Sequence, residues 1–142
     1  MLDDHAKPRL GAALERARLH WQQAVQKELA AQGVSWPGAA GDLLAHIPND
    51  GVGQAALTQQ TNMTKQAVQQ FLDQLEHKGL IRREPDPADR RAKRVALTPE
   101  GSNVLAAKTA AEAKVEHAFR DVLGKKRYGR LRRALRRLAS SG

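Results

Sequence analysis

Apolar residues recur at steps of three and four along most of the chain, which is the spacing of amphipathic helices. The pattern predicts helices over residues 8–32, 54–60, 65–77, 99–123 and 125–138, and a weaker helical segment over residues 35–47. Pro8 suits the first turn of the first helix and Gly33 suits its end, while Ser35 is the expected cap of the weaker segment. The stripe from Leu10 to Leu29 either faces a core or packs in part on a second subunit.

Two short strands are predicted between the helix over residues 65–77 and the helix over residues 99–123. Residues 80–83 form the first, and Val95 and Leu97 alternate with Arg94 and Ala96 as in a half-buried strand. Residues 84–87 are expected to break the first strand, with a loop following through Arg91. With the helix, turn and helix that precede it, this hairpin predicts a mainly α fold with a small β-hairpin wing, that is, a winged helix-turn-helix.

The predicted helix over residues 65–77 has an apolar face and a polar face, as any surface helix has. Its apolar side contains Ala67, Val68, Phe71, Leu72 and Leu75, and its polar side contains Lys65, Gln66, Gln69, Gln70 and Asp73. Thr64 can cap this helix, and the short helix before it is expected to turn Ala56 and Leu57 inward. The amide-rich centre of the polar face is unusual, because a glutamine offers a donor and an acceptor together. That pair matches the N6 and N7 edge of adenine in the major groove.

A basic cluster lies between the two predicted strands. It consists of Asp89, Arg90, Arg91, Lys93 and Arg94. A solvated run of charge is the common explanation for such a cluster, but this one directly follows a helix of the recognition type. We therefore expect it to contact phosphates or the adjacent minor groove. Asp89, two residues before Arg91, could orient the Arg91 guanidinium.

The overall charge supports a polyanionic partner. The 142 residues include 24 Lys or Arg and 15 Asp or Glu, for a formal charge of +9. A membrane is the less favoured partner, because no run of 18 apolar residues and no export signal is found, and we expect a cytoplasmic protein. The chain has no cysteine, which excludes disulfides, thiolate metal sites and a cysteine nucleophile. Its five histidines show no paired metal-ligand spacing, so we expect neither an enzyme, a metal site nor a cofactor.

Three stretches of the sequence resemble the multiple-antibiotic-resistance regulator (MarR) family. They are Thr64–Val68, Leu75–Ile81 and Asp86–Gly101, the last of which fills every fixed position of D-x-R-x-x-x-V-x-L-T-x-x-G. The resemblance implies a winged-helix homodimer in which residues 1–33 and 102–142 pair the subunits and residues 37–101 form the DNA-binding lobe. It also implies a repressor, less often an activator, that binds a pseudo-palindromic operator in double-stranded DNA.

The resemblance assigns roles to individual residues. Thr64, Lys65, Gln66, Gln69 and Gln70 would face the major groove, and Arg91, held by Asp89, would enter the minor groove. Many members release DNA when a small aromatic or phenolic anion enters a cleft, for which His20, Trp21 and Trp36 are the candidates here. The chain departs from the family in its small residues at 38–41 and in its highly basic last helix.

Two other functions compete with sequence-specific regulation. An architectural or accessory DNA-binding protein, without operator or ligand, would also use the +9 charge. A protein-interaction module with a decayed DNA site is disfavoured, because the motif over residues 86–101 is complete.

Overall fold

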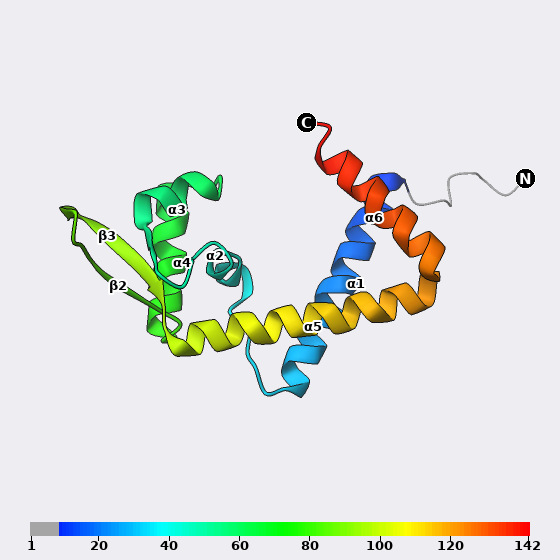
Figure 1. Ribbon diagram of the computed structural model, residues 1–142, viewed down its shortest axis with the longest axis horizontal. Coiled ribbons are helices and arrows are strands. Elements are labelled where there is room, and N and C mark those ends of the chain that lie inside the picture. Colours follow the sequence, from blue (N-terminus) through cyan, green and yellow to red (C-terminus); the bar gives the residue numbers. More distant parts are fainter. Residues whose placement is uncertain (1–8) are drawn as a thin grey trace, which may run out of the picture. The chain divides into compact units, whose positions relative to one another are not determined.

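The computed structural model describes residues 9–142, which form two compact units (Figure 1). One unit is Leu29–Thr109, and the other combines the described residues up to Glu28 with Ala110–Gly142. The elements are α1 (Leu10–Ala31), η2 (Gly38–Ala40), α2 (Gly41–Leu44), β1 (Val52–Gly53), α3 (Gln54–Gln60), α4 (Lys65–His77), β2 (Ile81–Asp86), β3 (Asp89–Leu97), α5 (Pro99–Leu123) and α6 (Lys125–Ala139). The predicted mainly α fold with a β-hairpin is confirmed. Pro8, predicted in the first turn of the first helix, lies outside the described residues.

The unit Leu29–Thr109 is built on one apolar core. Its largest fully buried side chains are Leu29, Leu43, Leu44, Leu57, Val68, Leu72, Leu75 and Val95. A three-stranded antiparallel sheet in the order β1-β3-β2 completes this unit. The sequence pattern missed β1, because a strand of two residues has no period of its own; Val52 is found opposite Val95 of β3.

Two expectations for the helical part of this unit are wrong. Leu57 is fully buried but Ala56 is exposed, because a helix of two turns with one buried face turns the neighbouring position about 100° away from the core. Ser35 does not cap the next segment: η2 starts at Gly38, preceded by Pro37, and no side chain caps it.

Among the small residues at 38–41, Gly41 has a steric reason. A Cβ added to Gly41 would lie 2.6 Å from Nε1 of Trp36 and closer still to two carbons of the same ring. The Trp36 indole therefore occupies the space that a larger side chain at Gly41 would fill. Lys108 places its ammonium 4.2 Å from the centre of the same ring.

The hairpin is longer than predicted, and its basic residues lie on a strand rather than on a loop. β2 continues through Glu84 and Pro85 to Asp86, and β3 already begins at Asp89. Pro85 is tolerated because β2 is an edge strand, where a missing N–H removes no bond to a further strand. Ala96 is also buried, at 3% exposure, instead of facing solvent.

The Thr98–Gly101 end of the motif forms the junction between the hairpin and α5. The Thr98 hydroxyl donates to the carbonyl of Gly79 at 2.6 Å and accepts from the backbone N–H of Gly101 at 3.0 Å. The backbone N–H of Thr98 donates to the carbonyl of Leu80 at 3.1 Å. Thr98 thus caps α5, as predicted, and also holds the start of α5 on the segment that follows α4.

The second unit contains most of α1, the end of α5, and α6. Val25, Ala111 and Val115 are buried in it. Phe119 stacks on His20 and meets Trp21 edge-on, with ring centres 5.6 and 5.5 Å apart.

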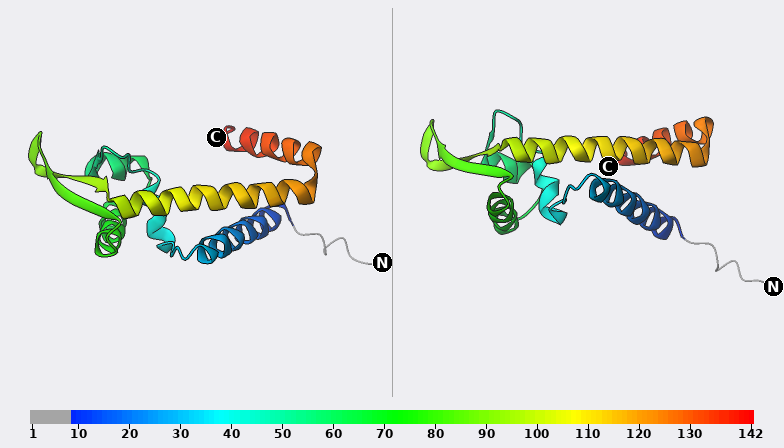
Figure 2. Two further views of the ribbon diagram at one scale, coloured as in Figure 1. Left: turned by 60° about the horizontal axis from the view of Figure 1, so that its bottom comes forward. Right: turned by 90° about the horizontal axis from the view of Figure 1, so that it is seen from below.

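α6 follows a reversal of the chain. Gly124, with φ of 81°, ends α5 as predicted, and α6 then runs back in the opposite direction (Figure 2). The Tyr128 hydroxyl donates to the Glu116 carboxylate, and this bond raises the pKa of Tyr128. No residue of α6 is buried.

Candidate nucleic-acid interface

The helix-turn-helix is formed by α3, the turn at residues 61–64, and α4. Asn62 makes the turn with a φ of 53°, the left-handed region that asparagine tolerates better than most residues. The Thr64 hydroxyl accepts from the backbone N–H of Ala67 at 3.0 Å, so the predicted cap is confirmed. Val68, Leu72 and Leu75 bury the inner face of α4, as predicted.

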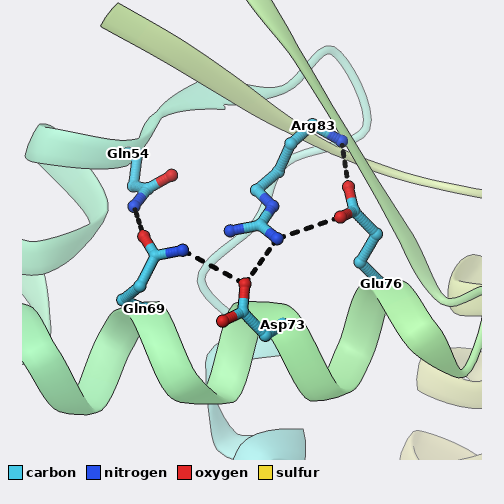
Figure 3. Close-up of polar contacts among 5 residues, drawn as sticks. All are labelled: Gln54, Gln69, Asp73, Glu76 and Arg83. Carbon is cyan, nitrogen blue, oxygen red and sulfur yellow. Dashed lines mark hydrogen bonds and ion pairs between the residues drawn. The ribbon is translucent and has the colours of Figure 1, made fainter.

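The outer face of α4 exposes the predicted polar residues, but the three glutamines differ. Gln69 accepts from Nε2 of Gln54 at 2.7 Å and donates to Asp73 at 3.1 Å (Figure 3). Gln66 and Gln70 are exposed, and neither forms a side-chain hydrogen bond with another described residue. The amides of Gln66 and Gln70 are therefore available to a base, whereas the amide of Gln69 is already bonded within the protein.

Arg83 of β2 connects the hairpin to α4, and the sequence analysis did not single it out. Its Nη2 donates to Asp73 at 2.6 Å and to Glu76 at 2.9 Å, while its backbone N–H donates to the second oxygen of Glu76 at 3.2 Å (Figure 3). The side chain of Arg83 is 10% exposed. Its hydrogen bond and positive charge hold the pKa of Glu76 below the ordinary glutamate value.

The strand period could have revealed this residue. Residues two apart on a strand share a face, so Arg83 lies on the same side as the buried Ile81. One carboxylate of this network, Asp73, also binds Gln69, and Gln69 binds Gln54 of α3. A single chain of polar contacts thus joins α3, α4 and β2.

Near the tip of the hairpin, Arg90, Arg91 and Lys93 are exposed. They border a hollow of about 330 Å³, which is also lined by Arg83, Glu84, Pro85 and Ala92. The Asp89 carboxylate accepts from the backbone N–H of Arg91 at 3.0 Å. Asp89 therefore shapes the start of β3 and does not bind the Arg91 guanidinium, which forms no ion pair with any described residue.

Arg94, the last member of the basic cluster, has partners within the protein. Its Nη2 donates to the carbonyls of Asp50 and Gly51 at 2.8 and 3.1 Å. These bonds fasten the turn before β1 to β3, so a structural role accounts for Arg94.

The positive charge of the chain does not come from the unit Leu29–Thr109, which contains the helix-turn-helix and the hairpin. Residues 29–109 contain nine Lys or Arg and eight Asp or Glu, a formal charge of +1. The exposed cations of the wing are thus a local feature of a nearly neutral unit, which suits a few positioned phosphate contacts.

The three candidate ligand residues are not brought together within one unit. His20 and Trp21 contact Phe119 in one unit, and Trp36 packs against Gly41 in the other. Each has a packing role of its own, and a ligand site at these residues stays a prediction. Among the described residues, no helix is both long and apolar enough to cross a bilayer.

This arrangement of elements has known counterparts. Residues 33–92 match the sequence profile of the MarR family. The chain is a MarR-family protein. This MarR-family chain is 46% identical over 57 residues to the transcriptional regulator HosA of Escherichia coli O111:H-, an alignment that covers 40% of the chain and 42% of HosA.

Two further comparisons extend over more of the MarR-family chain. It is 34% identical over 98 residues to a protein described as a regulatory protein for the hcr operon of Thauera aromatica, covering 68% of the chain and 58% of that protein. A crystal structure of a MepR–DNA complex from S. aureus superposes with a TM-score of 0.75 over 96% of the chain and 100% of MepR, at 22% identity. The structural match supports the fold, and the named relatives are regulators rather than enzymes, in agreement with the sequence analysis.

Proposed function

We propose that this MarR-family chain is a homodimeric transcription regulator that binds a pseudo-palindromic operator in double-stranded DNA and acts as a repressor. One observation supports DNA recognition above the others. The exposed amides of Gln66 and Gln70 and the exposed cations Arg90, Arg91 and Lys93 belong to one compact unit, whose elements are joined by the contacts of Arg83. A helix in the major groove with a wing at the neighbouring groove needs both sets.

The two amides and the wing have separable roles. Gln66 and Gln70 would discriminate between bases, at roughly 1–3 kcal/mol for each good bidentate pair. Arg91 would contact phosphates or a narrow minor groove and contribute affinity at many sequences. Gln69 would act through its bonds to Gln54 and Asp73 by holding the recognition face in place.

Selection of bound sequences from random duplexes tests this proposal. We expect an inverted repeat with half-sites about one helical turn, roughly 34–36 Å, apart. Gln66→Ala with Gln70→Ala should reduce the preference for that repeat, whereas Gln26→Ala, at an exposed glutamine of α1, should leave it unchanged. A selection that yields no repeat would exclude sequence-specific regulation.

A second copy of the chain is the proposed partner of the unit formed by α1, α6 and the end of α5. Large apolar side chains are exposed there in unusual number: Leu10, Leu14, Leu19, Val122, Leu131, Leu135 and Leu138. Exposed apolar surface of this kind suits an interface between subunits. Sedimentation should give twice the mass of the chain, and Leu131→Glu with Leu135→Glu should reduce it to that of a monomer.

We also propose release by a small aromatic anion, with a cytoplasmic location as expected for a DNA partner. An effector must bind the released conformation better than the DNA-bound one, and DNA must then weaken effector binding by the same factor. Titrating aromatic acids into the operator complex tests this, and His20, Trp21 and Trp36 are the residues to replace. A panel of such acids that never shifts DNA binding would indicate a constitutive regulator.

An architectural DNA-binding role is the second candidate, and the Arg-rich α6 favours it. It predicts equal affinity for unrelated duplexes and no effect of Gln66→Ala with Gln70→Ala. The selection experiment therefore separates the two functions.

A further inference from the structure

The formal charge of the chain is concentrated in α6. Its fifteen residues contain eight Lys or Arg and no Asp or Glu. Removing these eight from the total of +9 leaves +1 for the rest of the chain. The polyanion indicated by the composition should therefore be sought at α6 as well as at the wing.

Seven of the eight cations share one side of α6. At 100° per residue they lie within an arc of about 160°, opposite Leu131, Leu135 and Leu138. We call them the arginine face: Lys125, Lys126, Arg130, Arg132, Arg133, Arg136 and Arg137. All seven are exposed, and no carboxylate among the described residues forms an ion pair with them.

The arginine face repels itself. Arg132 and Arg136, like Arg133 and Arg137, stand four residues apart, where like charges destabilise a helix. Three of its arginines, Arg130, Arg133 and Arg137, border one hollow of about 670 Å³ together with Ala134, Leu138 and Ser141. A polyanion bound there would relieve the repulsion and meet several guanidinium groups at once.

The chemistry of the face favours nucleic acid over a lipid surface. An interfacial helix inserts its apolar side, made of Trp, Phe or Leu, into the bilayer. The apolar side of α6 consists of three leucines, but the proposed dimer gives that side a protein partner, so that it is not available to lipid. Over the length of α6, about 22 Å at 1.5 Å per residue, a duplex presents one phosphate charge about every 1.7 Å.

We propose that the arginine face of α6 is a second nucleic-acid-binding surface, which contacts the phosphate backbone independently of sequence and of the winged helix. This proposal rests on the proposed function in one respect only, namely that the leucine side of α6 is the contact between the two subunits of the dimer. Its contribution is affinity for any duplex, whereas Gln66 and Gln70 contribute preference among duplexes.

The test removes four charges from the arginine face and compares salt dependence. The variant is Arg132→Gln, Arg133→Gln, Arg136→Gln and Arg137→Gln. The control removes four exposed cations elsewhere: Arg9→Gln, Arg16→Gln, Lys27→Gln and Arg120→Gln. Binding to a random-sequence duplex and to the selected operator is measured between 50 and 200 mM salt (roughly the range over which phosphate contacts are weakened).

We expect the variant to lower the slope of log affinity against log salt by about 0.9 per lost phosphate contact, hence by about 3 to 4 for each α6 that contacts the duplex. Affinity for the random duplex should fall at least about tenfold, with the ratio of operator to random affinity retained. The control should keep the wild-type slope. An unchanged slope in the variant, or an equal fall in the control, would overturn the proposal.

The outcome is distinguishable from failure of the proposed function. A chain without operator preference whose random binding still depends on the arginine face would refute sequence-specific regulation and support this surface. Vesicles containing phosphatidylserine form a further arm: if the variant loses only vesicle binding, the face belongs to a membrane surface and the proposal is wrong. Should the variant lose helix content, two double variants test the slope separately. One is Arg132→Gln with Arg136→Gln, and the other is Arg133→Gln with Arg137→Gln. Each is expected to give half the change in slope.

Discussion

The backbone of Leu80 leaves no room for a side chain at Gly101. Gly101 is buried in the first turn of α5. A Cβ added there would lie 3.0 Å from the carbonyl carbon of Leu80 and 3.4 Å from its Cα, and closer still to its carbonyl oxygen. The obstacle is backbone that already accepts a hydrogen bond from Thr98, so no side-chain rotation relieves it.

Two opposing effects decide the outcome of Gly101→Ala. Alanine favours a helix over glycine by about 1 kcal/mol. Overpacking costs about 1–3 kcal/mol, and we take the upper end because the contact is with backbone. We therefore expect Gly101→Ala to lower the free energy of unfolding by about 2 kcal/mol.

Gly129→Ala is the matched control. Gly129 is also helical, in α6, and an added Cβ would meet only Nη1 of Arg133, at 3.7 Å. With no obstruction the propensity gain remains, and we expect stabilisation of about 0.5–1 kcal/mol. Urea unfolding of both variants at one fixed protein concentration measures the difference. A Gly101→Ala protein as stable as Gly129→Ala would refute the steric argument.

Three further predictions concern α4 and its contacts. Arg83→Met should lower the free energy of unfolding in urea by about 2 kcal/mol, because hydrogen bonds to two carboxylates are lost. The loss is no larger because the carboxylates of Asp73 and Glu76 are hydrated again in the variant. A change below about 0.5 kcal/mol would contradict this expectation. Because Arg83 lowers the pKa of folded Glu76, that stabilisation is present above the ordinary glutamate value of 4.5 and is lost as pH falls through the folded pKa. The stability gap between wild type and Arg83→Met should therefore narrow below about pH 4, and a constant gap would count against the pairing. Thr64→Ala should cost about 1 kcal/mol through loss of the α4 cap, with Thr109→Ala, at an exposed helical threonine, as a control near zero.

Local patterns were sufficient for α1, α3, α4, α5 and α6 and for one face of α4. The inner residues Val68, Leu72 and Leu75 could be assigned because helical period alone places them on one side. The cap at Thr64 and the turn at Gly124 were predictable for a similar reason, since both depend on neighbouring backbone.

The hairpin was harder to predict, because strand length depends on the partner strand. Pro85 suggested a break, but only the order of the sheet shows that β2 is an edge strand where proline is tolerated. Likewise, Asp89 could be paired with Arg91 from sequence, but whether its carboxylate binds the side chain or the backbone is a matter of geometry.

The sequence by itself determined the helical periods, the exposed amides of α4, the concentration of charge at the C-terminal end, and the motif from Asp86 to Gly101. Tertiary structure decided what several of these residues do. Gln69 is bonded to Gln54, fifteen residues away, and Arg94 is bonded to Asp50, forty-four residues away. Thr98 bonds to Gly79 and Leu80 ahead of α5, and Gly101 leaves room for the Leu80 carbonyl. The physical reason is common to all of them: side-chain period is local, whereas hydrogen-bond partners and steric limits come from segments distant in the chain.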